Sequence, residues 1–349
     1  MSSFSKTLLQ WYRLNKRNMP WVGETDPYKV WLSEVILQQT RVEQGTAYYL
    51  DFIKHYPTVQ HLAKASANEV MKRWEGLGYY SRARNMHATA NVITQQLKGV
   101  FPDTPEGLQS LKGIGKYTAN AILAYAYHKP YAVTDGNVLR ILSRYQGITI
   151  PVNTPAGKKM VEALADRLLD KQLPHTYNQA LMDFGSLVCT PRNPDCGNCP
   201  FRRSCYAFNH EMTAILPQKE KKRAAKTRYF NFFVMKSGNK VLIMPRHAAD
   251  IWKALWQFPL IETAEEATLQ DIQRSNVYKD WKLGKVQWEE AGTFKQQLTH
   301  RRLICRFFTG EIKTTPEIDG MQELVNRKEM ERFAFPGVIR DFMKGKLYF

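Results

Sequence analysis

The 349-residue sequence predicts a chain of two domains, the first mainly α-helical and the second a mixture of α-helices and β-strands. Three observations support this expectation. Apolar residues recur with helical spacing up to about residue 216, a basic stretch follows over 217–228, and the apolar pattern beyond it is that of β-strands. The composition, with 44% apolar and 23% charged residues, is that of folded proteins and excludes a wholly disordered chain.

The first domain, residues 1–216, is predicted from a series of amphipathic segments that are separated by helix caps and breakers. Helical periodicity is the dominant signal throughout this part of the chain, so we expect an all-α domain. The segments that carry the signal are residues 25–40, 67–78, 85–97, 116–128, 136–146 and 177–189.

The second domain, residues 229–349, follows the stretch 217–228, which has six basic residues against one acidic residue and indicates a linker. Two β-rich runs, RYFNFFVMK and KVLIMPR, flank a turn at 237–239 and predict a hairpin. Residues 301–312 predict another strand, and EMERFAFPGVIRDFMK predicts a closing helix over 329–344. A mixed α+β domain is therefore expected.

The charge balance points to a polyanionic partner. The chain has 50 Lys and Arg residues against 32 Asp and Glu, a formal net charge of +18. Basic side chains that neutralise phosphates release condensed counterions, so nucleic acid is the first hypothesis and an anionic membrane surface is its rival. No segment reaches the ~18 apolar residues that span a bilayer, and the N-terminus lacks a signal-peptide pattern. We expect a cytoplasmic protein with no membrane partner.

Four of the five cysteines lie within seventeen residues, in the segment CTPRNPDCGNCPFRRSC. In a reducing compartment such a group holds a metal more often than disulfides. Zinc ribbons usually have two C-x2-C knuckles, and this segment has one. The spacing therefore favours a [4Fe–4S] cluster, with zinc and no metal as the alternatives. The candidate ligands are Cys189, Cys196, Cys199 and Cys205.

Two glycines, Gly113 and Gly115, lie between a short predicted helix and a long one that starts near Tyr117. Glycine lets backbone N–H groups approach a phosphate at a helix N-terminus, where the helix dipole also favours an anion. An ordinary interhelical turn is the alternative. The basic composition favours phosphate binding.

These motifs resemble the helix–hairpin–helix DNA glycosylase superfamily with its [4Fe–4S] cluster. The resemblance rests on LKGIGKYTANAILAYA, VTDGNVLRIL and the cysteine loop 189–205, and it covers residues 1–210. Two branches compete, the bifunctional endonuclease III branch and the MutY adenine glycosylases. In endonuclease III, the residue two after the second hairpin glycine is a Lys that forms a Schiff base. Here that residue is Tyr117, and neighbouring Lys116 is turned about 100° away around the helix.

Further motifs favour the MutY branch. Asp135-Gly136-Asn137 matches its Asp-Gly-Asn, where endonuclease III has Asp-Thr-His, and WLSEVILQQT and GLGYYSRARN match as well. The resemblance therefore implies a helix–hairpin–helix glycosylase domain with an Fe–S loop, followed by a Nudix-like domain that reads the opposite base. It implies a monofunctional enzyme of base excision repair that flips adenine out of double-stranded DNA, opposite 8-oxoguanine or guanine, and hydrolyses its N-glycosidic bond. We expect a monomer that associates with the nucleoid through DNA.

Glu34 and Asp135 are the candidate catalytic carboxylates. Glu34 falls on the apolar face of its helix, where desolvation would raise its pKa, although a partly exposed Glu is the alternative. Asp135 could simply be the N-cap of the next helix. The resemblance implies that Glu34 protonates adenine N7 and that Asp135 stabilises or captures the oxocarbenium ion. It places Tyr117 and Asn137 in the same centre as hydrogen-bonding residues.

The resemblance also supplies candidate DNA-binding residues. Gln39 and Tyr79 match residues that wedge beside the opposite base, although both could be ordinary surface side chains. The remaining matches fall in the base pocket, namely Arg17, Trp21, Leu37 and Gln179.

A short loop of the second domain is the candidate reader of the opposite base. MutY uses Phe-Ser-His for 8-oxoguanine, and the segment Gln297-Leu298-Thr299-His300 matches it with Leu for Phe and Thr for Ser. The hydroxyl and imidazole are kept, so Thr299 and His300 are the candidate readers, although they could merely begin a strand. LWQFPLIETAEEATLQDIQR lacks the glycine pair and Glu-rich helix of a Nudix box, so diphosphate hydrolysis is not expected.

Two other functions stay open on the sequence. One is an endonuclease III-like glycosylase with lyase activity, which borohydride would trap on DNA. The other is a non-catalytic DNA-binding protein that senses redox state through its cluster, which adenine release from a mismatch would exclude.

Overall fold

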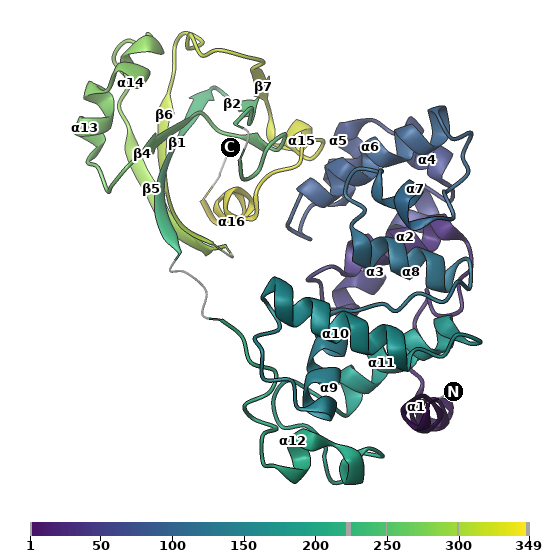
Figure 1. Ribbon diagram of the computed structural model, residues 1–349. Helices are drawn as coiled ribbons and strands as arrows, with labels where there is room; N and C mark the ends of the chain where they lie inside the picture. The colour runs from purple at the N-terminus through teal and green to yellow at the C-terminus, as the bar shows by residue number, and fades with distance from the viewer. Residues whose placement is uncertain (1, 221–224, 249, 299, 347–349) are drawn as a thin grey trace. The chain divides into compact units, whose positions relative to one another are not determined.

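A computed structural model describes residues 2–220, 225–248, 250–298 and 300–346 (Figure 1). Its contacts group the chain into two compact units that alternate along the sequence. The helical unit comprises Met1–Lys64 and Asn85–Lys221, and the sheet unit comprises Ala65–Arg84 and Lys222–Phe349. In the described residues, no helix combines the length and the apolar character needed to cross a membrane.

The fold class predicted from the sequence is confirmed, with a helical N-terminal part and a mixed C-terminal part. The contacts of Ala65–Arg84 nevertheless place these residues in the sheet unit, although the sequence predicts them to be part of the first domain. The limits 1–216, 217–228 and 229–349 stay a prediction, and part of the linker lies outside the described residues.

The helical unit contains the predicted helices and several short ones. Its elements are α1 (Ser3–Asn15), α2 (Pro27–Leu37), α3 (Val42–His55), α4 (Val59–Lys64), the larger part of α6 (Ser81–Gln95), α7 (Pro105–Gln109), α8 (Lys116–Tyr125), α9 (Gly136–Gln146), α10 (Pro155–Leu168), α11 (Pro174–Leu187), the 3₁₀ helix η1 (Arg202–Ser204) and α12 (Tyr206–Asn209).

Local chemistry fixes where these helices begin and end. Asp26 caps α2 by accepting a hydrogen bond from the Tyr28 N–H at 2.9 Å, and Pro27 occupies the first turn, where no donor is needed. Helix α9 is capped by Asp135 and ends at Gly147, whose φ of 73° is the left-handed conformation that stops a helix. These two caps set the positions of the helices that carry Glu34 and Asn137.

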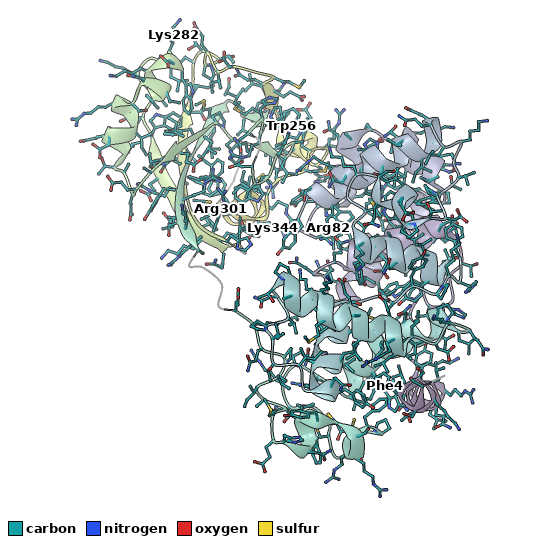
Figure 2. All side chains as sticks on the ribbon, in the orientation of Figure 1. Phe4, Arg82, Trp256, Lys282, Arg301 and Lys344 are labelled. Atoms are coloured by element: carbon teal, nitrogen blue, oxygen red, sulfur yellow. The ribbon has the colours of Figure 1, made fainter. Side chains whose placement is uncertain are left out.

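Aromatic side chains build the core under α1, α9 and α11. Phe4, labelled in Figure 2, stacks on Phe201 with 4.5 Å between ring centroids, and Phe184 meets Phe201 edge-on at 5.3 Å. Tyr177 of α11 is fully buried in the same cluster. The core thus joins α11 to the segment that contains the cysteine loop.

The sheet unit is built on a seven-stranded mixed sheet with the order β3-β2-β1-β6-β5, in which β4 also pairs with β1 and β7 with β2. Strands β1 and β6 are parallel, and the other pairs are antiparallel. Its elements are α5 (Ala67–Arg73), β1 (Lys226–Ser237), β2 (Lys240–Pro245), β3 (Trp256–Gln257), β4 (Leu260–Thr263), α13 (Leu269–Arg274), α14 (Asn276–Asp280), β5 (Glu289–Gln297), β6 (Arg301–Glu311), β7 (Glu323–Val325), α15 (Arg327–Met330) and α16 (Gly337–Lys346).

Two of the three predictions for this unit are confirmed. Strands β1 and β2 form the expected hairpin, with Ser237 paired to Lys240, and β6 is the expected strand. The single closing helix over 329–344 is wrong, because α15 ends at Met330 and α16 begins only at Gly337. Pro336 explains the break, since proline cannot donate a helical hydrogen bond and disfavours helical backbone in the residue before it.

Residues 65–84 are held in the sheet unit by hydrogen bonds. The Phe335 N–H donates to Glu75 Oε1 at 2.8 Å, Lys72 Nζ donates to the Phe333 carbonyl at 3.0 Å, and Arg84 donates to the Lys253 carbonyl at 2.7 Å. The first two bonds tie the segment to the break between α15 and α16, which gives that break a structural role.

Candidate active site

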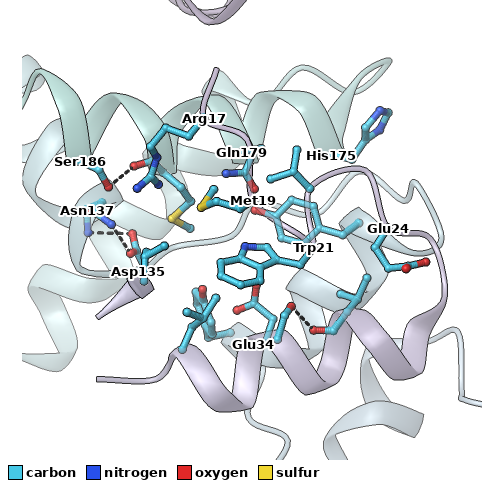
Figure 3. Close-up of a pocket in the computed structure, with 18 of the residues that line it drawn as sticks. Arg17, Met19, Trp21, Glu24, Glu34, Asp135, Asn137, His175, Gln179 and Ser186 are labelled. Carbon is cyan, nitrogen blue, oxygen red and sulfur yellow. Dashed lines mark hydrogen bonds between the residues drawn. The ribbon is translucent and has the colours of Figure 1, made fainter. Parts of the chain in front are cut away.

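A pocket of about 910 Å³ opens in the helical unit, within the size range of sites that bind small molecules or single bases. Its lining residues come from the loop after α1 and from helices α1, α2, α3, α8, α9, α10 and α11, and Figure 3 draws several of them. Glu34 comes from α2, Tyr117 from the first turn of α8, Asp135 from the cap of α9 and Gln179 from α11. Residues 145 positions apart in the chain are therefore brought to one cavity.

Glu34 is a carboxyl of this pocket whose pKa is shifted far from its ordinary value. Burial raises the pKa of Glu34 to about 7, a hydrogen bond with Tyr117 opposes that rise, and the charge of Asp135 adds to it. Burial also raises the pKa of Tyr117 well above its ordinary value, so Tyr117 stays protonated and able to donate. Near neutral pH the Glu34 carboxyl is therefore divided between a proton donor and a carboxylate.

Asp135 is the N-cap of α9, as the sequence allowed, and it also lines the pocket. Its Oδ1 accepts the N–H groups of Asn137 at 2.8 Å and Val138 at 2.9 Å, which caps α9, and its Oδ2 accepts from Asn137 Nδ2 at 2.8 Å. Burial raises the pKa of Asp135, while these hydrogen bonds and Arg140 oppose that rise by favouring the charged form. The cap therefore also fixes a carboxylate in the pocket wall.

Buried arginines connect this carboxylate to the cysteine loop. Arg140 Nη2 donates to Asn137 Oδ1 at 2.8 Å, and its Nε donates to the Cys189 carbonyl at 2.7 Å. One turn further along α9, Arg144 donates to the Thr190 carbonyl at 2.7 Å and to Cys189 Sγ at 3.5 Å. The loop and the Asp135 cap are thus held by one helix.

The four candidate metal ligands are brought together in one loop. Cys189, Cys196, Cys199 and Cys205 are free thiols, and each of the other three influences the pKa of Cys199, which burial raises to about 12. Among the described residues, no three His, Cys, Asp or Glu side chains meet at the position of a single metal ion. The four neighbouring thiols lie beside the buried guanidinium of Arg144. This set of groups suits an anionic group that is bound through thiolates.

The structure brings the predicted base-pocket residues together. Arg17, Trp21, Leu37 and Gln179 all line the pocket that contains Glu34 and Asp135, and Gln39, predicted as a wedge residue, lines it as well. Sequence reasoning missed other lining residues, and spacing along α11 could have found two of them, because they follow Gln179 by three and seven positions. The missed residues include Tyr125, His128, Thr134, His175, Met182 and Ser186.

The glycine turn leads directly into the N-terminus of α8. Gly113 has a φ of +84°, and a Cβ built on it would lie 2.8 Å from Asn85 Cβ, so only glycine fits. Gly115 is the N-cap of α8, and a Cβ there would meet nothing within 4 Å. One glycine therefore serves the turn, and the other leaves the helix N-terminus open.

Lys116 does not face the pocket. Its Nζ pairs with Glu162 Oε2 at 2.6 Å, its side chain is 60% exposed, and it is not among the residues that line the cavity. Lys158 of α10 does line the pocket, at an exposed position. The residue next to Tyr117 is thus turned away from Glu34.

The two candidate wedge residues share an unusual backbone conformation. Gln39 has a φ of 58° and Tyr79 a φ of 46°, the left-handed region that costs a residue with a Cβ on the order of 1 kcal/mol. Tyr79 is also 47% exposed, which is high for an aromatic side chain. Such strain at exposed residues is typical of functional sites.

A second pocket, of about 640 Å³, lies within the sheet unit. Tyr79 and Arg84 line it from one side, and Leu298, His300 and Arg301 line it from the hairpin turn between β5 and β6. Strand β6 begins at Arg301, so His300 belongs to the turn and not to the strand. The other candidate reader, Thr299, lies outside the described residues.

Comparison with family models divides the chain in two. A model of HhH-GPD superfamily base excision DNA repair proteins matches residues 32–170, and a NUDIX domain model matches residues 231–345. The first match contains Glu34, Gly113, Tyr117 and Asp135.

Similar proteins extend over most of the chain. An adenine DNA glycosylase of Buchnera aphidicola subsp. Baizongia pistaciae is 35% identical over 307 residues, which cover 86% of this chain and 84% of the relative. An adenine DNA glycosylase of Mus musculus is 32% identical over 332 residues, covering 78% of this chain and 64% of that protein. The similarity to the first of these includes both units.

Solved structures resemble the helical part. A thermostable thymine-DNA glycosylase, 28% identical, superposes with a TM-score of 0.56 over 59% of this chain and 95% of its own. An endonuclease III trapped as a covalent intermediate with DNA has a TM-score of 0.52 over 60% of this chain and 95% of its own, at 18% identity, which is evidence of a shared fold alone.

Proposed function

The chain belongs to the adenine DNA glycosylase family and is an enzyme of base excision repair, and on this premise we propose that it removes adenine opposite 8-oxoguanine or guanine by hydrolysis alone. The observation that carries the proposal is a carboxyl with a pKa near 7, Glu34, in the same pocket as a capped carboxylate, Asp135. Two carboxyls in unlike environments supply an acid and an anion to one reaction.

Glu34 is the proposed general acid. Adenine is a poor leaving group as an anion, and protonation of its ring nitrogen N7 lets it depart as a neutral base. The pKa of about 7 leaves a large fraction of Glu34 protonated at neutral pH. Tyr117 holds the carboxyl in place through its hydrogen bond.

Asp135 is the proposed stabiliser of the sugar cation. Departure of the base leaves positive charge on the deoxyribose, and a fixed carboxylate lowers the energy of that state without having to reorganise. Three hydrogen bonds from Asn137 and Val138 hold Asp135 in place. Water then adds to the sugar carbon, one proton is lost, and an abasic site remains in an uncut strand.

The position of Lys116 supports hydrolysis without strand cleavage. A lyase needs an amine at the sugar, and the residue beside Tyr117, Lys116, is paired with Glu162 outside the pocket. Lys158 is the exposed lysine that lines the cavity, so it is the first candidate for any Schiff base that forms.

When adenine is extruded from the duplex, residues outside the base pocket must fill the gap and contact the opposite base. Gln39 and Tyr79, strained and placed at exposed turns, are the proposed wedges. Tyr79 and His300 line one pocket of the sheet unit, which supports a role for that pocket in reading the opposite base. Thr299 is proposed as a second reader on the resemblance alone.

The cysteine loop is proposed to bind a [4Fe–4S] cluster. Four neighbouring thiols are the donor set of such clusters, which as bound groups supply electron-rich sulfurs and a rigid loop. Iron at about four atoms per chain in the purified protein would support this assignment. Zinc in equal amount to protein, without iron, would overturn it.

The function is tested with duplexes that carry adenine opposite 8-oxoguanine, guanine, cytosine or thymine. We expect base release opposite 8-oxoguanine and guanine, intact strands until alkali is added, and no protein–DNA adduct with borohydride. An adduct that disappears in Lys158→Gln would instead identify a lyase that uses that amine. A monomeric state and a cytoplasmic, DNA-associated location stay predictions.

A further inference from the structure

A buried carboxylate stands directly behind the pocket wall. Asp183 of α11 has no exposed surface, and its Oδ1 accepts from Gln179 Nε2 at 2.9 Å and from Arg17 Nε at 3.0 Å. Its Oδ2 accepts the backbone N–H of Arg17 at 2.9 Å. Both partners line the base pocket, whereas Asp183 itself does not.

This arrangement fixes which end of the Gln179 amide faces the pocket. A carboxylate only accepts hydrogen bonds, so the group that meets Asp183 must be the NH₂ of Gln179. The carbonyl oxygen Oε1 is then left on the other end, without a partner among the described residues. Figure 3 shows Gln179 and Glu34 on different walls of the same pocket.

The orientation matters because purines differ at their six-position. Adenine carries an amino donor there, whereas guanine and hypoxanthine carry a carbonyl acceptor. An acceptor on the pocket wall pairs with the amino group and opposes the carbonyl. An amide that could turn round would present a donor as readily as an acceptor and would lose this distinction.

On the basis of the proposed function, we propose that Asp183 is a positioning residue that sets base specificity by holding the Gln179 carbonyl toward the pocket. Arg17 completes the arrangement, because its guanidinium also pairs with Asp183 Oδ1, at 2.9 Å. The guanidinium therefore holds the buried carboxylate beside the amide, where one carboxylate oxygen accepts hydrogen bonds from both side chains. Specificity for the amino group thus depends on a residue that never touches the base.

The test compares single-turnover release of three target bases opposite 8-oxoguanine, namely adenine, unsubstituted purine and hypoxanthine. Asp183→Asn replaces the pure acceptor by a group with a donor and an acceptor, which allows Gln179 to turn. We expect the ratio of adenine to hypoxanthine release to fall about tenfold, the size expected for one misplaced buried hydrogen bond. Unsubstituted purine has neither an amino nor a carbonyl group at the six-position. Its release therefore measures any loss of activity that is unrelated to recognition of that position.

Asp170→Asn is the matched control. Asp170 is also buried, 3% exposed, and its Oδ1 accepts the N–H groups of Gln172 at 2.9 Å and Leu173 at 3.0 Å, away from the pocket. This variant is expected to keep the wild-type ratio, whatever its stability. If the ratio of adenine to hypoxanthine release falls in both variants, the effect is a general structural one, and the proposal is overturned.

Gln179→Leu tests the same idea with Asp183 intact. It is expected to lower the adenine-to-purine ratio, and the double variant Asp183→Asn/Gln179→Leu is expected to show the same ratios as Gln179→Leu alone. Unchanged ratios in Gln179→Leu, or additive losses in the double variant, would overturn the proposal even if Asp183→Asn fails to fold. Absence of adenine release by the wild-type protein would instead refute the proposed function.

Discussion

Glu34 is the residue on which the proposed chemistry depends most. Replacing it by Gln keeps the shape of the side chain but removes the proton donor, so adenine release is expected to fall by at least ~10²-fold while binding to mismatched DNA is retained. Single-turnover release and fluorescence anisotropy measure the two effects. Glu211→Gln, an exposed change outside the pocket, is the control, and near-normal turnover by Glu34→Gln would reject the assignment.

The pH dependence of the reaction gives a second test at this scale. Glu34 acts in its protonated form, so the rate is expected to fall as pH rises through its pKa of about 7. The Tyr117 hydrogen bond lowers the pKa of Glu34, and Tyr117→Phe is therefore expected to move the midpoint of the pH–rate profile upward.

Tyr125→Phe provides the comparison, because it removes a hydroxyl from the same pocket and leaves the bond between Tyr117 and Glu34 in place. Its midpoint is expected to stay near that of the wild type. A midpoint that moves downward in Tyr117→Phe would mean that the hydrogen bond stabilises the neutral carboxyl instead.

Glu34 and Asp135, which local motifs of the sequence singled out, lie in one pocket, and their catalytic roles stay a prediction. The sequence could not predict how Gln179 and Asp183 cooperate, although they lie four positions apart on one helix. Their hydrogen bond has the ordinary i,i+4 spacing of a helix, but Arg17, which donates to the same carboxylate oxygen, lies in the loop after α1, 166 positions from Asp183. Such a contact depends on packing and leaves no periodic signal.

At the scale of elements, the glycine hairpin offers a pair of contrasting substitutions. Gly115→Ala places a methyl group in open space at the N-cap of α8, so it is expected to lower the melting temperature less than Gly113→Ala and to weaken DNA binding, because a phosphate can no longer approach closely. Gly113→Ala is expected to lower the melting temperature, because its φ is +84° and its new Cβ would meet Asn85.

Calorimetry and anisotropy across a salt series separate the two variants. Full DNA affinity in Gly115→Ala would show that the turn is structural and that phosphate binds elsewhere.

Elements with strong local signals were predicted most accurately. Helix α9 spans 136–146 as expected, because its cap and its terminal Gly147 are both visible in the sequence. The prediction of a single closing helix is wrong because the apolar pattern continues across Pro336, whereas the backbone does not stay helical there. Strand β5 was missed because its nine residues, EEAGTFKQQ, contain one large apolar side chain.

At the scale of the whole molecule, the two units divide the proposed work, with base release in the helical unit and reading of the opposite base in the sheet unit. His300→Ala is therefore expected to reduce the preference for 8-oxoguanine over guanine about fivefold, the cost of roughly one hydrogen bond, while release at saturating enzyme is kept. His247→Ala, exposed in the same unit and outside the pocket, is the control. If His300→Ala keeps the wild-type preference for 8-oxoguanine over guanine, the residues that read the opposite base lie in another part of the sheet unit.

The interleaving of the units could not be predicted from the sequence. Residues 65–84 carry helical signals like their neighbours, and their attachment to the sheet unit rests on hydrogen bonds to residues more than 160 positions away. A deletion of 229–349 would remove those partners and expose the surface that they cover. Point variants such as His300→Ala therefore test the reader more cleanly than truncation does.

The central claim, that Glu34 protonates the departing base at N7, is tested most directly with 7-deazaadenine, in which a C–H group replaces that nitrogen. The measurement is single-turnover release of adenine and of 7-deazaadenine from duplexes that are otherwise identical and carry 8-oxoguanine opposite. The wild-type enzyme is expected to bind both duplexes with similar affinity and to release only adenine. Release of 7-deazaadenine at a comparable rate would contradict the account, because no proton from Glu34 could then have reached N7.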